Sequence, residues 1–589
     1  MYKAPLKELR FVMHQVVRDD QLTGLAAFAD YSPDFADSVL EEAGKFAEEV
    51  LAPINRVGDV KGARWTPDGV VMPQEFKDAY TRFIEGGWPM LRANPEHGGQ
   101  GAPNILGTAI EELWASSNLA FKLCPMLSQG AVEAIEECGS EAQKQKFLPR
   151  MVSGEWTGTM VLTEPQAGSD LGAIRTRAVP EGDHYRIYGQ KIFITYGDHD
   201  YTPNTIHMVL ARIEGSPPGT KGISLFIVPK VLVNDDGSLG ERNDVRCVSI
   251  EHKLGIHASP TCVMAFGDQR GAVGYLVGEQ NRGLEYMFIM MNAARLSVGL
   301  EGYAIAEGAF QQALTYARSR VQGRPGGKSA APGKAQPIAF HPDVKRMLLT
   351  MKAYADAARS IALYAALQLD LGRHHPDEGS RNASQARGDL LIPIVKAWST
   401  ELGVAMASMG IQIHGGMGFI EETGAAQYLR DVRITTIYEG TTGIQSADLV
   451  GRKVGRDGGS VMNTLISEMN AELEAMAAND AVATAALEGT KLLRDATASL
   501  LQFYREDVER ALAASVSYLT LCGVVIGGWL MARANDIAGR EMNRDPEFYR
   551  GKQQIVRAYV EQILPQAYAL ARIVKSGSDS VVQADPALL

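Results

Sequence analysis

The first part of the chain carries apolar residues at helical spacing. Between residues 35 and 50, an apolar side chain recurs every three or four positions, and mostly acidic or lysine side chains occupy the other face. A helix turns once in 3.6 residues, so this spacing collects the apolar side chains on one face. Residues 131–151 repeat the pattern. We therefore expect residues 1–154 to form an N-terminal helical domain.

Near Glu155 the pattern changes to short apolar runs that are separated by turns rich in glycine, proline and aspartate. Runs of this length between such turns are typical of β-strands. The expected strands lie in residues 158–163, 185–195, 206–213, 222–230 and 245–250. The pattern predicts a middle β domain, a barrel or a sandwich, at residues 155–275.

Helical spacing returns after the expected β domain. Residues 287–321 are mostly small or apolar and contain no proline, whereas residues 322–337 are rich in glycine and proline and predict a loop. A glycine cluster at residues 454–460 predicts a linker. We expect a helical bundle at residues 276–455 and an additional helical domain at residues 456–589. The predicted fold class is therefore multidomain α+β.

Composition narrows the class of protein. The chain has 589 residues, of which 46% are hydrophobic, and its 58 basic and 69 acidic side chains give a net charge of −11. Such a chain can bury several cores. Nucleic-acid binding depends on clustered lysine and arginine, so nucleic acid is not the expected main partner. The composition suits a soluble cytoplasmic enzyme.

Cysteine content and hydropathy exclude further classes. The five cysteines contain no CxxC pair, so we expect neither a disulfide framework nor a zinc site. The first residues carry scattered charges and predict no signal peptide. Residues 511–532 are uncharged and long enough to span a bilayer, but they are rich in alanine, glycine and serine. We interpret them as a buried helix, so no transmembrane segment is expected.

Two segments in the expected β domain could bind a cofactor. Residues 163–170, Thr-Glu-Pro-Gln-Ala-Gly-Ser-Asp, follow a strand. Consecutive small residues in a turn can direct several backbone N–H groups at a phosphate or at the edge of a ring. Phe193, Ile194 and Thr195 end a later strand and place an aromatic ring and a hydroxyl on one face. An ordinary turn and a hairpin edge are the alternative interpretations.

Two further segments lie in the expected bundle. Glu439 stands between Tyr438 and Gly440, next to apolar Ile437. A carboxylate that is partly removed from water has a raised pKa and can act as a base, although a helix-capping glutamate would show the same pattern. Residues 412–419, Gln-Ile-His-Gly-Gly-Met-Gly-Phe, allow a close backbone approach or form a helix end.

Taken together and in this order, these motifs resemble the acyl-CoA dehydrogenase family over about residues 35–455. The start of the chain and the extra C-terminal domain are similar to the 3-methylthiopropanoyl-CoA dehydrogenase subgroup, which implies a role in dimethylsulfoniopropionate catabolism. The family fold is an N-terminal helical domain, a middle β domain and a C-terminal four-helix bundle. The resemblance implies FAD between the β domain and the bundle, and a homodimer or a dimer of dimers.

The resemblance also implies which residues hold FAD. Met160, Leu162, Thr163, Gly168 and Ser169 match the strand and turn that hold the flavin ring and the pyrophosphate. Phe193, Ile194 and Thr195 match the segment beside the ring. The contacts from the neighbouring subunit to the pyrophosphate and the adenosine half are matched by Arg320, Gln322, Gln412, Gly415 and Gly416. Thr441 matches the threonine that follows the catalytic pair.

Glu439 matches the catalytic base of the family. The other family position for the base is occupied here by Ala294, which cannot accept a proton. The positions that face substrate are matched by Ser169, Asn292, Arg295, Tyr438 and Gly440. The implied reaction is α,β-dehydrogenation of an acyl-CoA thioester to the trans-2-enoyl-CoA. The implied electron acceptor is an electron-transferring flavoprotein.

The resemblance leaves two alternative functions. An acyl-CoA oxidase shares the fold and the base but passes electrons to oxygen. A DNA-associated flavoprotein of the same superfamily would need a basic C-terminal domain, whereas residues 456–589 contain 13 basic and 17 acidic side chains. The pattern leaves the acyl chain length open, and a short thioether chain is the first expectation.

Overall fold

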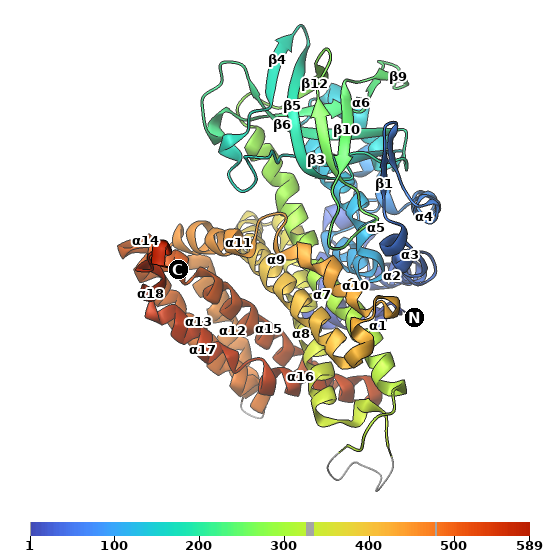
Figure 1. The fold of residues 1–589 in the computed structure, drawn as a ribbon. Helices are drawn as coiled ribbons and strands as arrows, with labels where there is room; N and C mark the ends of the chain where they lie inside the picture. The colour runs from blue at the N-terminus through green and yellow to red at the C-terminus, as the bar shows by residue number, and fades with distance from the viewer. Residues whose placement is uncertain (1, 326–334, 478–479, 589) are drawn as a thin grey trace. The chain divides into compact units, whose positions relative to one another are not determined.

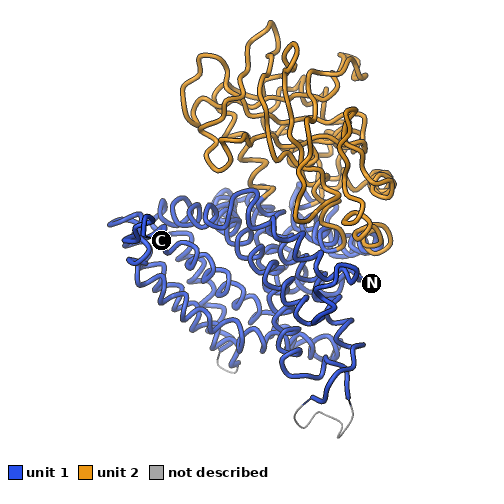
Figure 2. Tube along the Cα trace, in the orientation of Figure 1, with its two compact units in different colours: residues 1–45, 103–116, 295–589 blue, residues 46–102, 117–294 orange. Residues whose placement is uncertain are grey.

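The computed structural model describes residues 2–325, 335–477 and 480–588 (Figure 1). The chain divides into two compact units (Figure 2). Unit 1 comprises residues 1–45, 103–116 and 295–589, and unit 2 comprises residues 46–102 and 117–294. The predicted loop at residues 322–337 lies partly outside the described residues.

Unit 2 is built around an eight-stranded sheet. Strands β6 and β7 are buried almost throughout, as expected for strands covered on both sides. The order is β10-β11-β5-β12-β7-β6-β3, and β4 pairs with β5 and β6. The strands are β3 (Trp156–Val161), β4 (Arg177–Glu181), β5 (His184–Thr195), β6 (Asn204–Ile213), β7 (Ser224–Pro229), β10 (Val245–Ile250), β11 (Thr261–Phe266) and β12 (Ala272–Val277).

Two hairpins and several helices complete unit 2. The hairpins are β1 (Arg64–Thr66) with β2 (Gly69–Val71), and β8 (Val231–Val233) with β9 (Leu239–Arg242). The first hairpin falls in the region that was predicted to be helical. The helices are α3 (Ala52–Lys61), α4 (Gln74–Glu85), most of α5 (Asn104–Cys138) and α6 (Glu141–Val152). Ser140 caps α6, so the predicted helix at residues 131–151 is two helices.

Unit 1 contains the helical bundle and the extra C-terminal helices. The bundle consists of α7 (Gly283–Ser319), whose first residues belong to unit 2, with α8 (Pro342–His374), α9 (Glu378–His414), α10 (Ala425–Val432) and α11 (Thr442–Asp448). The N-terminal helices are α1 (Leu6–Arg10) and α2 (Pro33–Phe46). The extra helices are α12 (Ser460–Ala477), α13 (Ala481–Glu506), α14 (Val508–Ala513), α15 (Ser515–Arg540), α16 (Pro546–Gln562), α17 (Gln566–Ser576) and α18 (Asp579–Val582).

The extra helices pack on the bundle through α15, which contacts both α8 and α9 (Figure 1). A Cβ atom at Gly523 would lie 2.4 Å from the ring of Trp398, so only glycine permits this approach. Two helical segments, residues 378–419 and 515–540, are long and apolar enough to cross a membrane, but 78% and 83% of their most apolar windows are buried. This burial supports the interpretation of residues 511–532 as buried helix.

Candidate active site

Glu439 lies in a tight turn between Arg433–Thr436, a 3-10 helix, and helix α11. Its φ is +54°, and that of Gly440 is +91°. A non-glycine residue with a backbone in this left-handed region is strained. This conformation persists only where the surrounding structure imposes it. A Cβ at Gly440 would also lie 2.7 Å from Nε2 of Gln445. The turn therefore requires glycine after the glutamate.

Three side chains hold the turn. Lys396 of α9 donates from Nζ to the C=O groups of Thr435 at 2.9 Å and Gly440 at 2.6 Å. Gln445 donates from Nε2 to the C=O of Glu439 at 3.0 Å. Thr441 caps α11 by accepting from the Ile444 N–H at 3.3 Å. The backbone that carries Glu439 is thus fixed on both sides of this residue.

The carboxyl of Glu439 has an unusual charge environment. Burial raises its pKa to about 7, against the lowering effect of Lys396 and Arg295, and Glu301 raises it further. Both the ionised and the neutral form are therefore populated near neutral pH. A carboxylate with a pKa in this range can accept a proton and later release it.

Two predicted substrate-facing residues of unit 1 contact other buried groups. The Tyr438 hydroxyl donates to the carboxylate of Glu301. Arg295 is only 5% exposed, and its Nη1 lies 3.3 Å from Oδ2 of Asp448. Asn292 lies on the first part of α7, which belongs to unit 2. The substrate contacts of these residues stay predictions.

In unit 2 the structure brings two of the predicted motifs together. The Thr163 C=O accepts from the Ile192 N–H at 2.9 Å, so the turn after β3 lies beside the end of β5. Thr159 donates from Oγ1 to the C=O of Thr195 at 2.7 Å. Met160 is buried in β3, and Leu162 follows that strand directly.

A buried ion pair that the pattern did not reveal anchors this turn. The Glu164 carboxylate accepts from Lys191 Nζ at 2.9 Å, from Arg175 N–H at 2.7 Å and from Thr176 N–H at 3.0 Å. Burial raises the pKa of Glu164, but Lys191 and these hydrogen bonds outweigh it and lower the pKa to about 2. Lys191 also donates to the Leu162 C=O at 2.8 Å. Glu164 therefore has a structural role within the motif.

Phe193 is presented to solvent by a bulge. The pairing of β11 with β5 shifts register between Cys262 and Met264, opposite Ile194 and Lys191. A bulge redirects a side chain, and here Phe193 has φ +60° and is 58% exposed, whereas Ile194 is buried. An exposed aromatic ring on strained backbone marks a surface that a planar partner could cover.

The remaining predicted cofactor residues are exposed. Gly168 and Ser169 lie on the turn after β3, and the nearest atom to a Cβ at Gly168 is 3.9 Å away. Arg320 and Gln322 follow α7, Gln412 lies in the last turn of α9, and Gly415 and Gly416 begin the 3-10 helix that follows α9. His414 is buried, donates from Nδ1 to the Gly410 C=O at 2.7 Å, and stacks on Tyr316. These contacts indicate a structural role for His414.

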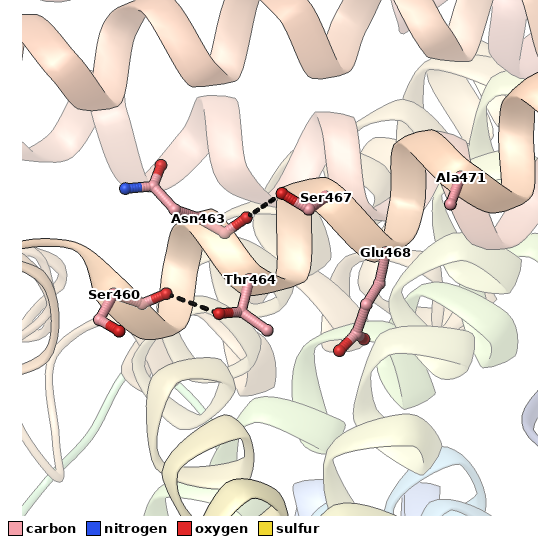
Figure 3. Close-up of a pocket in the computed structure, with 6 residues that line it drawn as sticks. All are labelled: Ser460, Asn463, Thr464, Ser467, Glu468 and Ala471. Atoms are coloured by element: carbon pink, nitrogen blue, oxygen red, sulfur yellow. Dashed lines mark hydrogen bonds between the residues drawn. The ribbon is translucent and has the colours of Figure 1, made fainter.

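A surface pocket along α12 has no catalytic character (Figure 3). The hydroxyls of Thr464 and Ser467 donate to the C=O groups of Ser460 and Asn463. The carboxylate of Glu468 pairs with Arg387, with Nη2 at 2.7 Å. The hydroxyls of Thr464 and Ser467 and the carboxylate of Glu468 are thus satisfied within the protein.

Family models match the chain almost from end to end. The models described as acyl-CoA dehydrogenase N-terminal, middle and C-terminal domain match residues 34–155, 159–269 and 281–454. A model described as acetyl-CoA dehydrogenase C-terminal like matches residues 465–585. The predicted succession of a helical domain, a β domain, a helical bundle and an additional helical domain is confirmed.

Individual acyl-CoA dehydrogenases are similar to the chain over nearly its full length. The chain is 44% identical to 3-methylmercaptopropionyl-CoA dehydrogenase of Ruegeria pomeroyi, over 99% of each chain. It is 32% identical to a butyryl-CoA dehydrogenase of Syntrophomonas wolfei, over 99% of this chain and 98% of the other. A solved structure of acyl-CoA dehydrogenase complexed with FAD from Bacillus anthracis is 21% identical, with a TM-score of 0.74, and covers 100% of this chain and 94% of the other. At 21% identity, the similarity to this structure shows a shared fold.

Proposed function

The chain belongs to the acyl-CoA dehydrogenase family, and from that premise we propose that Glu439 removes the α-proton of a short-chain acyl-CoA. The family makes the chain an FAD-dependent oxidoreductase. The observation that supports Glu439 is its position in a strained, doubly anchored turn, with a pKa of about 7. Among the two family positions for the base, only this one carries a carboxylate.

The residues of unit 2 fit FAD. A planar ring needs an apolar face and polar groups at its edge, and the exposed Phe193 lies in the same strand end as Thr195, beside Thr163. A pyrophosphate needs exposed backbone N–H groups, and the exposed turn at Gly168 and Ser169 leaves room for it. When bound, FAD supplies a two-electron acceptor for the hydride from the β-carbon of the substrate.

The protein's own part is to hold, polarise and deprotonate the substrate. A thioester α-proton is weakly acidic, so its removal needs a base in a water-poor position and stabilisation of the developing enolate. In this proposal Glu439 accepts the pro-R α-proton on a carboxylate oxygen. Its own backbone N–H donates to the thioester oxygen, and the anchored turn keeps both groups in register with the two reacting carbons.

The same proposal includes the substrate, the product, the electron acceptor, the location and the oligomeric state. The substrate is 3-methylthiopropanoyl-CoA, because the relative with that activity in its name is 44% identical over the full length, against 32% for the butyryl-CoA enzyme. The product is the trans-2-enoyl-CoA, and the electrons pass to an electron-transferring flavoprotein. The protein works in the cytoplasm as a homodimer or a dimer of dimers, in which Arg320, Gln322 and residues 412–416 contact the neighbour's cofactor.

A substrate panel tests this proposal. The native holoprotein is mixed without oxygen with acyl-CoA thioesters of increasing length and with 3-methylthiopropanoyl-CoA, and the loss of flavin absorbance is followed. We expect the fastest bleaching with the thioether substrate. Faster bleaching by a long-chain thioester would contradict the assignment of the substrate. A colourless protein that takes up no FAD would contradict the whole proposal. Peroxide release during turnover in air would favour an oxidase.

A further inference from the structure

A buried lysine lies beneath the Glu439 turn and has no part in the reaction as proposed so far. Lys396 is 0% exposed, although it carries an ammonium group. Lysine is almost never fully buried unless it is paired. Its Nζ donates to the C=O groups of Thr435 and Gly440, which bracket the turn on its two sides. A single side chain thus ties together both ends of the segment that carries Glu439.

Neutral carbonyl groups alone do not compensate a buried positive charge. The compensating carboxylates come from Glu439 itself, from Glu301 of α7 and from Glu401 of α9, while Arg295 of α7 opposes the charge. Burial lowers the pKa of Lys396 to about 8 despite these carboxylates, so the ammonium form predominates at pH 7. The charge of Lys396 is therefore present while Glu439 titrates.

Helix α7 reaches this lysine by close backbone contact. A Cβ at Gly299 would lie 3.0 Å from the backbone nitrogen of Lys396, and one at Gly302 would lie 2.1 Å from the C=O oxygen of Ser399. Only glycine at these two positions lets α7 lie so near α9. This approach places Glu301, between the two glycines, against the same buried site, where the Tyr438 hydroxyl donates to it.

We infer that Lys396 is a positioning residue of the proposed dehydrogenation: it fixes the turn that directs the Glu439 carboxyl, and its charge favours the carboxylate that accepts the proton. This inference rests on the proposed function. The groups that act on Glu439 are Lys396 from α9 and Arg295 and Glu301 from α7. Removing the charge of Lys396 leaves Arg295 as the remaining cation of this set, so Glu439 must become harder to ionise.

The first test compares Lys396→Gln, which keeps one donor and loses the charge, with Lys396→Arg, which keeps the charge. Flavin bleaching by acyl-CoA is measured against pH in each FAD-loaded protein. We expect the midpoint of the pH profile to rise by about one unit or more in Lys396→Gln, so that bleaching at pH 7 falls by about fivefold or more and partly recovers at pH 9. Lys396→Arg should keep the native midpoint with a lower plateau, because a planar guanidinium does not match the two carbonyls in the same way.

A matched control separates charge near Glu439 from general loss of a mostly buried lysine. Lys352 lies in another ion cluster of unit 1, with Nζ 3.0 Å from Glu307 and 3.0 Å from Asp356. Lys352→Met should lower stability without moving the pH midpoint. A shift equal to that of Lys396→Gln in this control, or an unmoved midpoint in Lys396→Gln, overturns the inference. If Lys396→Gln does not fold, a shifted midpoint in Lys396→Arg overturns it and the native midpoint supports it.

A second readout does not depend on turnover. Glu439 has a folded pKa above its ordinary value, so it stabilises the fold at low pH and this contribution is lost as the pH rises through about 7. Glu439→Gln should therefore raise the melting temperature at pH 8, and by more in the Lys396→Gln background than in the native one. Equal effects in both backgrounds contradict the coupling. Normal bleaching by Glu439→Gln alone would instead refute the proposed function.

Discussion

At the residue scale, the proposed chemistry depends on the protonation state of Glu439. Burial raises its pKa to about 7, and only the ionised carboxylate can accept the α-proton. The bleaching rate should therefore be low at acid pH and reach a plateau above neutrality. Between pH 6 and pH 8 the ionised fraction changes about tenfold for a single group of this pKa. We expect a rate increase of that size for the native holoprotein.

Rapid-mixing measurements of flavin bleaching at constant ionic strength test this pH dependence. Glu378→Gln is a suitable control, because Glu378 is an exposed side chain in the first turn of α9, 18 residues before Lys396. This variant should show nearly the native profile. A native rate that is flat from pH 6 to pH 8 would disagree with a base whose pKa is about 7.

The sequence identified Glu439 through its neighbours but not the reason for its pKa. The residues that set its charge environment, Lys396 and Glu301, are 43 and 138 positions earlier in the chain and stand in helical stretches where lysine and glutamate usually mark a solvated face. Their burial depends on the glycines of α7, whose close approach to α9 is a long-range property. A pattern of local spacing cannot reveal it.

At the element scale, the pair Lys191 and Glu164 joins the ends of β3 and β5. Lys191 is 0% and Glu164 4% exposed. Removal of one partner leaves a buried charge, which typically costs about 3–5 kcal/mol. We expect Lys191→Met to lower the free energy of unfolding by about 3 kcal/mol, since Glu164 keeps two backbone donors, and to weaken FAD retention.

Urea unfolding and the flavin content of the purified protein measure the two effects. Lys221→Met, at an exposed lysine of the same unit, should change stability by less than about 0.5 kcal/mol. The pKa of Glu164 is lowered, so the pair's contribution is present above about pH 4.5 and is lost as the pH falls toward 2. A Lys191→Met protein as stable as the control would show that the pair does not anchor the turn.

Most elements were predictable because their apolar spacing repeats over many residues. The exceptions are short or depend on distant contacts. The hairpin of β1 and β2 has three residues in each strand, too few to show alternation. The bulge that exposes Phe193 arises from pairing with β11, about 70 residues later, and is not visible in the β5 segment itself.

At the scale of the whole chain, a buried ion cluster ties the N-terminal segment and the extra C-terminal helices to the bundle within unit 1. Arg359 of α8 lies 2.6 Å from Glu112 and 3.0 Å from Glu307. Lys552 of α16 lies 2.7 Å from Asp356 and 2.5 Å from Glu8. These groups come from α1, α5, α7, α8 and α16, so α1 and α16 depend on the same charges.

Lys552→Met should therefore destabilise unit 1 by about 3–5 kcal/mol, because it leaves Glu8 and Asp356 with one cation fewer in a buried site. Hydrogen exchange should show faster exchange in α1 and α16 together. Lys575→Met is the control, since that exposed lysine lies 3.8 Å from Asp495 and should contribute little. Faster exchange in α16 with α1 unchanged would argue against a shared cluster.

The order of domains was predictable from the sequence, whereas this cluster was not. Helical periodicity and a glycine-rich linker are local features, and they give the same order of domains as the family models. Glu8 and Lys552 are separated by 544 positions. Nothing in their own segments distinguishes them from surface charges.

The most direct test of the central claim compares native protein with Glu439→Gln at equal FAD content, using 3-methylthiopropanoyl-CoA with and without deuterium at C2. We predict that deuterium slows flavin bleaching by the native protein, and that Glu439→Gln bleaches at least about 100-fold more slowly than native. Bleaching by Glu439→Gln within a few-fold of the native rate would contradict the assignment of Glu439 as the base.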